Sequence, residues 1–116
     1  MPGEKIEPRL LAEIREAESS ARPQRRLSVI IAHATGPADA DRDRRLDYAE
    51  LEARVRAEQQ GLRRRLLELG VDGGAMRQIT LAHALEASLT PAQILDVAER
   101  SDVRSIVWNR EQQVTA

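Results

Sequence analysis

The amino-acid sequence predicts an α+β fold in which an antiparallel sheet carries two helices on one face. The first observation is the spacing of the apolar residues. In some segments they recur at every second position, as in a strand, and in others at every third or fourth position, as in a helix. The second is the length: 116 residues, 41% of them hydrophobic, are enough to close one core but not two. Tyr48 and Trp108 are the only aromatic residues, so the core must be built from aliphatic and alanine side chains.

Charge and composition exclude several classes of partner. Charged residues make up 32% of the chain, but the net charge is only −1, so no overall field attracts nucleic acid or an anionic membrane. Cysteine is absent, which excludes disulfides and thiolate metal sites and favours a reducing compartment. No run approaches the ~20 apolar residues of a membrane span. We therefore expect a cytoplasmic protein with no membrane partner, no nucleic-acid partner and no cofactor.

The first half of the chain contains a strand between two helical patterns. Residues 9–17 follow Pro8 and have apolar positions at helical spacing, which predicts a short N-terminal helical appendage. Residues 27–33 are a run of β-formers that is apolar on both faces, as in a central strand. From Tyr48 the apolar residues recur every three, four or seven positions until Gly70, which predicts one long helix.

The second half predicts a strand pair, a short helix and a last strand. Residues 77–89 alternate with period two, so they form one long strand or two strands joined by a bend. Thr90, Pro91 and Gln93 have the spacing of a capping box at a helix start. Residues 103–108 are the last strand. The order after the appendage is that of ferredoxin-like βαββαβ domains, and it divides the chain into 1–26 (helix and linker), 27–109 (α+β domain) and 110–116 (tail).

Residues 83–109 resemble the subtilisin-propeptide inhibitor family. The matching residues are Leu89-Thr90-Pro91, Gln93, Val103 and Ile106. Ala84 and Leu85 depart from the pattern, because the family prefers Gly and Phe there. The resemblance covers roughly the last third of the chain closely, and the first strand and long helix only by their order.

The resemblance implies that the domain is not an enzyme but binds a subtilisin-like serine protease as an inhibitor or folding chaperone. The sheet would pack on two helices of the protease, and the tail would lie in the substrate cleft like a product, as an added β-strand. Either Thr115 or Ala116 would lie nearest the primary specificity pocket. The implied binding residues are Trp108, Asn109, Glu111, Gln112, Gln113, Val114, Thr115 and Ala116.

Two further expectations come with the resemblance. The family places acidic residues after the last strand to cap the protease helices, and here Val107 stands at the first such position and Asn109 at the second. Because the chain has its own Met1 and stops at the tail, we expect a stand-alone protein whose protease is encoded separately.

Two other functions remain open. One is a ferredoxin-like ligand-sensing or dimerisation module. The other is calcium binding through an EF-hand-like loop, in which Arg44 stands where the sharp turn normally requires Gly. A solvated loop whose acidic residues favour the next helix start is the simpler interpretation, and His33 and His83 are expected to be structural. The carboxylates of the loop are Asp39, Asp41, Asp43, Asp47 and Glu50.

Overall fold

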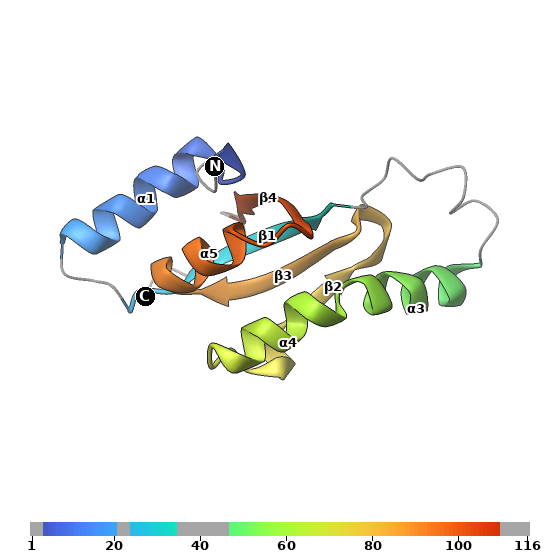
Figure 1. The fold of residues 1–116 in the computed structure, drawn as a ribbon. Coiled ribbons are helices and arrows are strands. Elements are labelled where there is room, and N and C mark those ends of the chain that lie inside the picture. Colours follow the sequence, from blue (N-terminus) through green and yellow to red (C-terminus); the bar gives the residue numbers. More distant parts are fainter. Residues whose placement is uncertain (1–3, 21–23, 35–46, 110–116) are drawn as a thin grey trace.

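The computed structural model describes residues 4–20, 24–34 and 47–109, and these residues form the α+β fold that the sequence predicts (Figure 1). Two single 3-10 turns, η3 (Gly73–Ala75) and η4 (Thr80–Ala82), flank the shortest strand. The helices and strands are α1 (Pro8–Ser19), β1 (Leu27–His33), α3 (Tyr48–Glu58), α4 (Gln60–Glu68), β2 (Arg77–Ile79), β3 (Ala84–Leu89), α5 (Pro91–Ala98) and β4 (Val103–Trp108).

The four strands form one antiparallel sheet in the order β2-β3-β1-β4. β1 is central, as its two-sided apolar pattern predicts. Ile31 lies opposite Leu85 of β3 and Ile106 of β4, so the middle of the sheet is apolar on that face. The pairing of β1 with β4 shifts between Ala32 and His33, which leaves one extra residue in β4 at that point.

The core lies between one face of the sheet and three helices, α1, α4 and α5. In Figure 1, α4 and α5 cross in front of the strands. The strands and the helices supply aliphatic side chains that are almost fully buried. The largest of them are Leu10, Ile14, Leu27, Ile31, Leu62, Leu66, Leu85, Leu89, Ile94 and Ile106.

The N-terminal helix α1 is part of this core. The sequence predicts a helical appendage, which would have lain outside the core. Leu10 and Ile14 of α1 are buried in the same cluster as the strand residues. Just before α1, the backbone N–H of Ile106 donates to the carbonyl of Lys5 at 2.7 Å, and the N–H of Glu7 donates to the carbonyl of Ile106 at 2.9 Å. The N-terminal segment therefore covers part of the outer edge of β4, and a covered edge is protected from pairing with other chains.

The single long helix predicted from Tyr48 onward is wrong, because the chain forms α3 and α4 with a break at Gln59. The Gln59 side chain is fully buried, and its Nε2 donates to the carbonyl of Ala84 at 2.8 Å. A buried amide requires such a partner. The apolar period continues across the break, so the pattern alone does not reveal it.

The two-strand interpretation of residues 77–89 is confirmed. β2 and β3 are joined by η4 and by His83, which has the left-handed conformation with φ 49° and ψ 48°. The His83 ring is fully buried, and its Nδ1 lies 3.2 Å from Oε2 of Glu58. The His83 carbonyl accepts a 2.9 Å hydrogen bond from the N–H of His33, so the bend is tied to β1.

The predicted capping box at the start of α5 is also confirmed. The N–H of Gln93 donates to Thr90 Oγ1 at 3.3 Å, and the N–H of Thr90 donates to Gln93 Oε1 at 2.9 Å. Gln93 has a second role, because its Nε2 donates to the carbonyl of Leu69 at the end of α4 at 3.0 Å. The Gln93 side chain thus helps to cap the start of α5 and also forms a hydrogen bond with the end of α4.

Candidate protein-binding surface

The sheet has a second face, turned away from the helices of the core. Residues directly opposite each other on antiparallel strands share a face, so the strand register identifies its members. We call this surface the open face. Its residues are Ser28, Ile30, Ala32, Arg77, Ile79, Ala84, Glu86, Ser88, Ser105 and Val107, of which Ser28 and Ala84 are buried.

The open face is small and apolar at its centre and charged at its β2 edge. Ile30, Ala32 and Val107 are half-buried, on the neighbouring strands β1 and β4. At the other edge Nη2 of Arg77 lies 3.6 Å from Oε2 of Glu86. An apolar centre with a charged margin is the composition of a protein-binding surface.

The structure separates the two described residues that the resemblance assigned to binding. Trp108 lies opposite the buried Val29, is half-buried and packs against the core. Asn109 continues β4, because its N–H donates to the carbonyl of Ser28 at 2.8 Å. By the alternation of the strand, Asn109 is on the same side as Val107 and belongs to the open face, whereas Trp108 closes one end of the core.

The remaining predicted binding residues, Glu111, Gln112, Gln113, Val114, Thr115 and Ala116, lie outside the described residues, as do Asp39, Asp41 and Asp43 of the calcium hypothesis. Of the last two loop carboxylates, Asp47 has a structural role: its Oδ1 accepts the N–H of Glu50 at 2.8 Å and caps α3. Within residues 4–20, 24–34 and 47–109, no group of three or more metal-ligating side chains comes together. In the same ranges, no helix is long and apolar enough to cross a bilayer.

Two ion pairs lie in and beside the helix layer that packs on this sheet. Arg65 of α4 holds Asp96 of α5 with two hydrogen bonds of 2.9 and 2.7 Å, and these bonds lower the pKa of Asp96. Arg100 holds Asp102 in the same way at 2.9 and 3.0 Å. Burial acts to raise the pKa of Asp102, but the hydrogen bonds and charge of Arg100 outweigh it and lower that pKa.

His33 lies beside the second of these pairs. Its Nε2 is 3.9 Å from Oδ2 of Asp102, and its side chain is almost fully buried. With His83 next to Glu58, both histidines face a carboxylate, and they lie at the same end of the β1–β3 pair, where the N–H of His33 donates to the carbonyl of His83. Both are built into the packing around β1, as the structural interpretation of the sequence expects.

Sequence reasoning did not identify Ile30 and Ala32 as surface residues. The run 27–33 is apolar on both faces and predicts a central strand, but this pattern does not tell which face of the strand the helices cover. The signal that could have found them is the small size of Ala32 and of the serines on its face, since a second helix layer would require larger side chains. Comparisons of the chain with protein-family models, curated proteins and solved structures find no match.

Proposed function

We propose that this protein is a non-enzymatic binding domain that inhibits a subtilisin-like serine protease or assists its folding. The observation that carries the proposal is the open face, a sheet surface with an apolar centre and with Val107 and Asn109 at the end of its last strand. In the family that residues 83–109 resemble, the equivalent surface docks on the protease. A domain that binds the native protease and not its unfolded chain also stabilises the native form, so one surface serves both roles.

We infer that the fold is ferredoxin-like. β1 and β2 are both antiparallel to β3, so they are parallel to each other, and β3 and β4 are parallel for the same reason. Each parallel pair is connected through helix: α3 and α4 in the first case, α5 in the second. The order β4-β1-β3-β2 is expected when two such units interleave, and it supports this inference.

In the proposed mechanism, the sheet and the tail bind different parts of the protease. The open face packs on two helices of the protease, and the side-chain oxygen of Asn109 accepts a hydrogen bond from an unpaired N–H at a helix start. Residues 111–116 enter the substrate cleft as an added strand, with Thr115 or Ala116 at the primary specificity pocket. No cofactor takes part, the partner is a separately encoded protease, and we propose the cytoplasm as the place of action.

The proposal is tested by titrating a subtilisin with the intact protein and following peptide hydrolysis. Ala32→Arg puts a long charged side chain on the open face and is expected to weaken inhibition at least tenfold. Glu99→Arg, an exposed position at the end of α5, is the matched control and should leave inhibition unchanged. Val107→Asp supplies the acid that the family has at this position and should strengthen inhibition.

A truncation that lacks residues 112–116 separates the two parts of the mechanism. It should retain binding to the protease but lose most of the inhibition. If the intact protein neither binds nor inhibits subtilisins, including any encoded next to its gene, the proposal is wrong. Equal inhibition by the intact protein and by Ala32→Arg would refute the role of the open face.

The second candidate is a dimerisation or ligand-sensing module that pairs through the same face. Ile30, Ala32 and Val107 carry no charge, which favours the dimerisation module, because the apolar centres of two such sheets can pack on each other. Light scattering distinguishes the candidates. A module of this kind forms a stable dimer that Ala32→Arg breaks and that deletion of residues 112–116 does not affect.

A further inference from the structure

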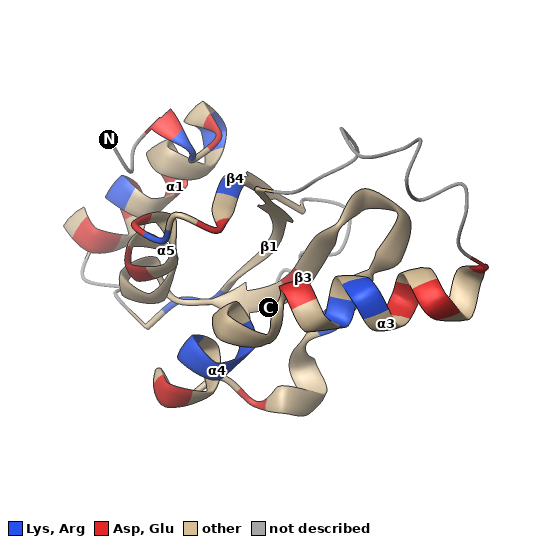
Figure 2. Ribbon diagram, turned by 45° about the vertical axis from the view of Figure 1, so that its right-hand side comes forward, with Lys and Arg blue, Asp and Glu red and all other residues tan. Residues whose placement is uncertain are grey.

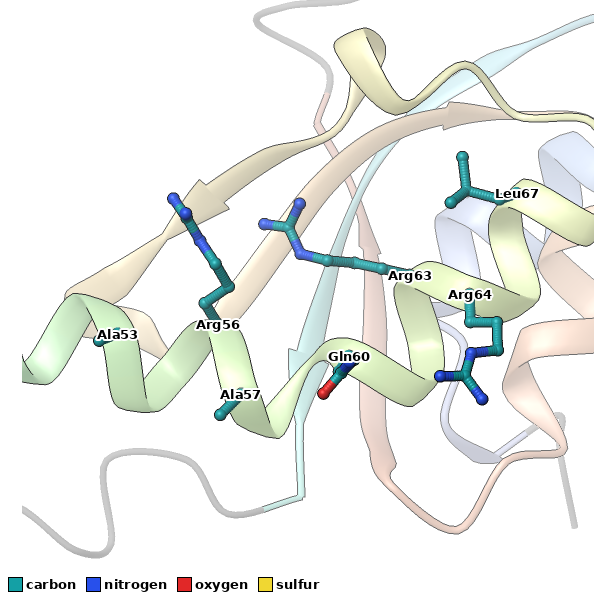
Figure 3. A pocket seen from close by; sticks show the side chains of 7 residues that line it. All are labelled: Ala53, Arg56, Ala57, Gln60, Arg63, Arg64 and Leu67. Carbon is teal, nitrogen blue, oxygen red and sulfur yellow. The ribbon is translucent and has the colours of Figure 1, made fainter.

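A shallow groove runs along the exposed side of α3 and α4 and crosses the break between them (Figure 3). Its volume is about 540 Å³. The residues that line it recur at three- and four-residue spacing, so they form one stripe along both helices. Those that matter here are Ala53, Arg56, Ala57, Arg63, Arg64 and Leu67.

The groove is positively charged. Arg56, Arg63 and Arg64 line it, and no carboxylate does. In the described part of the chain none of these three forms an ion pair, whereas Arg65, on the side of α4 that faces α5, is fully paired with Asp96. Figure 2 shows acidic residues on the first turns of α3 and basic residues farther along it, and the helix ends at Glu58, which pairs with Arg54 and not with Arg56. The groove therefore lies where the positive charge is not compensated.

Arg63 is the most buried of the three arginines, and its polar contacts are with neutral groups. Its Nη2 lies 3.5 Å from Oε1 of Gln59 and 3.4 Å from Oε1 of Gln78, which are long contacts with neutral amides. Its Nε is buried and has no hydrogen-bond partner. Burial and, after it, the charge of Arg56 lower the pKa of Arg63. Figure 3 shows the guanidinium groups of Arg56 and Arg63 turned to the same side. One carboxylate placed between them would therefore offset the positive charge of both.

Apart from Gln60, the rest of the groove is apolar, and the groove is elongated. Ala53 and Ala57 are exposed one helical turn apart, and Leu67 is 54% exposed. The stripe from Ala53 to Leu67 is about 21 Å long at 1.5 Å per residue, which is four turns of helix and much longer than a small anion. Small residues at helical spacing allow a second helix to approach to the usual 8–10 Å between axes.

We propose that this groove is the docking site of an acidic amphipathic helix from another protein. The apolar stripe of that helix packs on Ala53, Ala57 and Leu67. Its Asp or Glu side chains form charge-assisted hydrogen bonds with Arg56 and Arg63 on one side and Arg64 on the other. The groove is on the helix layer and the proposed protease surface is on the open face of the sheet, so this inference does not depend on the function proposed above.

The test uses fluorescently labelled peptides of about 20 residues, which as a helix of about 30 Å cover the whole length of the groove. The first has leucines at helical spacing flanked by glutamates, the second has glutamine in place of every glutamate, and the third is a scrambled form of the first. We expect saturable binding of the first peptide by fluorescence anisotropy, weakened by salt. The glutamine and scrambled peptides should bind at least tenfold more weakly.

Variants of the intact protein locate the binding. Arg56→Glu with Arg63→Glu should reduce the affinity at least tenfold, whereas Arg104→Glu, an exposed position in β4, should not change it. Circular dichroism melting checks that each variant is folded. In NMR spectra the acidic peptide should shift the backbone amide signals of Ala53, Ala57 and Leu67.

Three results would overturn the inference. One is the absence of binding, or equal binding of the scrambled peptide. Another is displacement of the peptide by millimolar inorganic phosphate or by a short DNA duplex, because the groove would then be a general anion site. The last is a concentration-dependent dimer that the Arg56→Glu and Arg63→Glu pair dissociates, because the occupant would then be a second copy of this chain.

Discussion

The Nε2 of Gln59 donates a 2.8 Å hydrogen bond to the carbonyl oxygen of Ala84, and this bond joins the break between α3 and α4 to the first residue of β3. Gln59 is fully buried, so its amide has little access to water. Gln59→Ala removes the donor and leaves a cavity. We expect a loss of about 2 kcal/mol in the free energy of unfolding, from the lost bond and the lost packing together. Urea denaturation measures it.

Gln60→Ala is the matched control, because Gln60 is the same residue type one position later and is exposed. Its effect should stay within ~0.5 kcal/mol, as for most surface substitutions. Equal stability of the two variants would mean that the buried amide contributes nothing to the native state.

A second prediction separates the two roles of Gln93. Gln93→Glu retains an oxygen that accepts the N–H of Thr90 but removes the donor to the carbonyl of Leu69. Thr90→Ala removes the other half of the capping box and should destabilise by ~1 kcal/mol. Gln93→Glu should also destabilise, because a carboxylate replaces the donor next to a carbonyl. If Gln93→Glu is as stable as the wild type by thermal melting, the bond to Leu69 carries no stability.

The strand positions and the start of α5 were predictable from sequence because local chemistry determines them. The capping box needs only Thr90 and Gln93 three residues apart, and the β-former run from Leu27 to His33 has no other simple interpretation. The break at Gln59 was not predictable. The Gln59 side chain at the break bonds to Ala84, 25 residues away, and the helical period continues through the break, so the local pattern shows neither.

The positions of the N-terminal helix and of the binding surfaces also depend on contacts between residues that are far apart in the sequence. The stripe of Leu10 and Ile14 indicates that α1 packs on something, but only the contacts with β4 and α5 identify the partner. Trp108 and Asn109 are neighbours in sequence, and the register with β1 decides that they face opposite sides of the sheet. The groove on α3 and α4 depends on which arginines find a carboxylate, and that is a matter of tertiary packing.

His83 provides a test of the left-handed bend before β3. At φ 49° and ψ 48° a β-branched side chain is strongly disfavoured, whereas Asn tolerates this conformation. Both His83→Asn and His83→Val lose the contact with Glu58. We expect His83→Val to be less stable than His83→Asn by about 1–2 kcal/mol in urea denaturation. The reverse order would mean that burial of an apolar side chain outweighs the backbone strain.

The two bidentate ion pairs predict a loss of stability in acid. The folded pKa values of Asp96 and Asp102 are lowered, so the folded state binds their protons less tightly than the unfolded chain does. Their contribution is complete above the ordinary carboxyl pKa of about 4 and disappears as the pH falls through the lowered folded values. The double variant Asp96→Asn and Asp102→Asn should be less stable than the wild type at pH 7.

The difference in unfolding free energy between the double variant and the wild type should shrink as the pH falls below the ordinary carboxyl pKa, because the unfolded wild type then takes up protons that the folded state binds less tightly. Urea midpoints measured across this range test it. Glu99→Gln, at an exposed position, is the control and should follow the wild type throughout. A difference that stays constant with pH would show that the substitutions act through packing and not through charge.

Leu10 tests whether α1 belongs to the core. Its side chain is 0% exposed and lies in the same cluster as residues of β1, β3, β4 and α5. Leu10→Ala should therefore cost about 2–5 kcal/mol, the range for a large-to-small change in a packed core. Leu11→Ala, at a half-buried position of the same helix, controls for the change in helix propensity and should cost clearly less. If the two variants melt at the same temperature as the wild type, the helix is an appendage and the core closes without it.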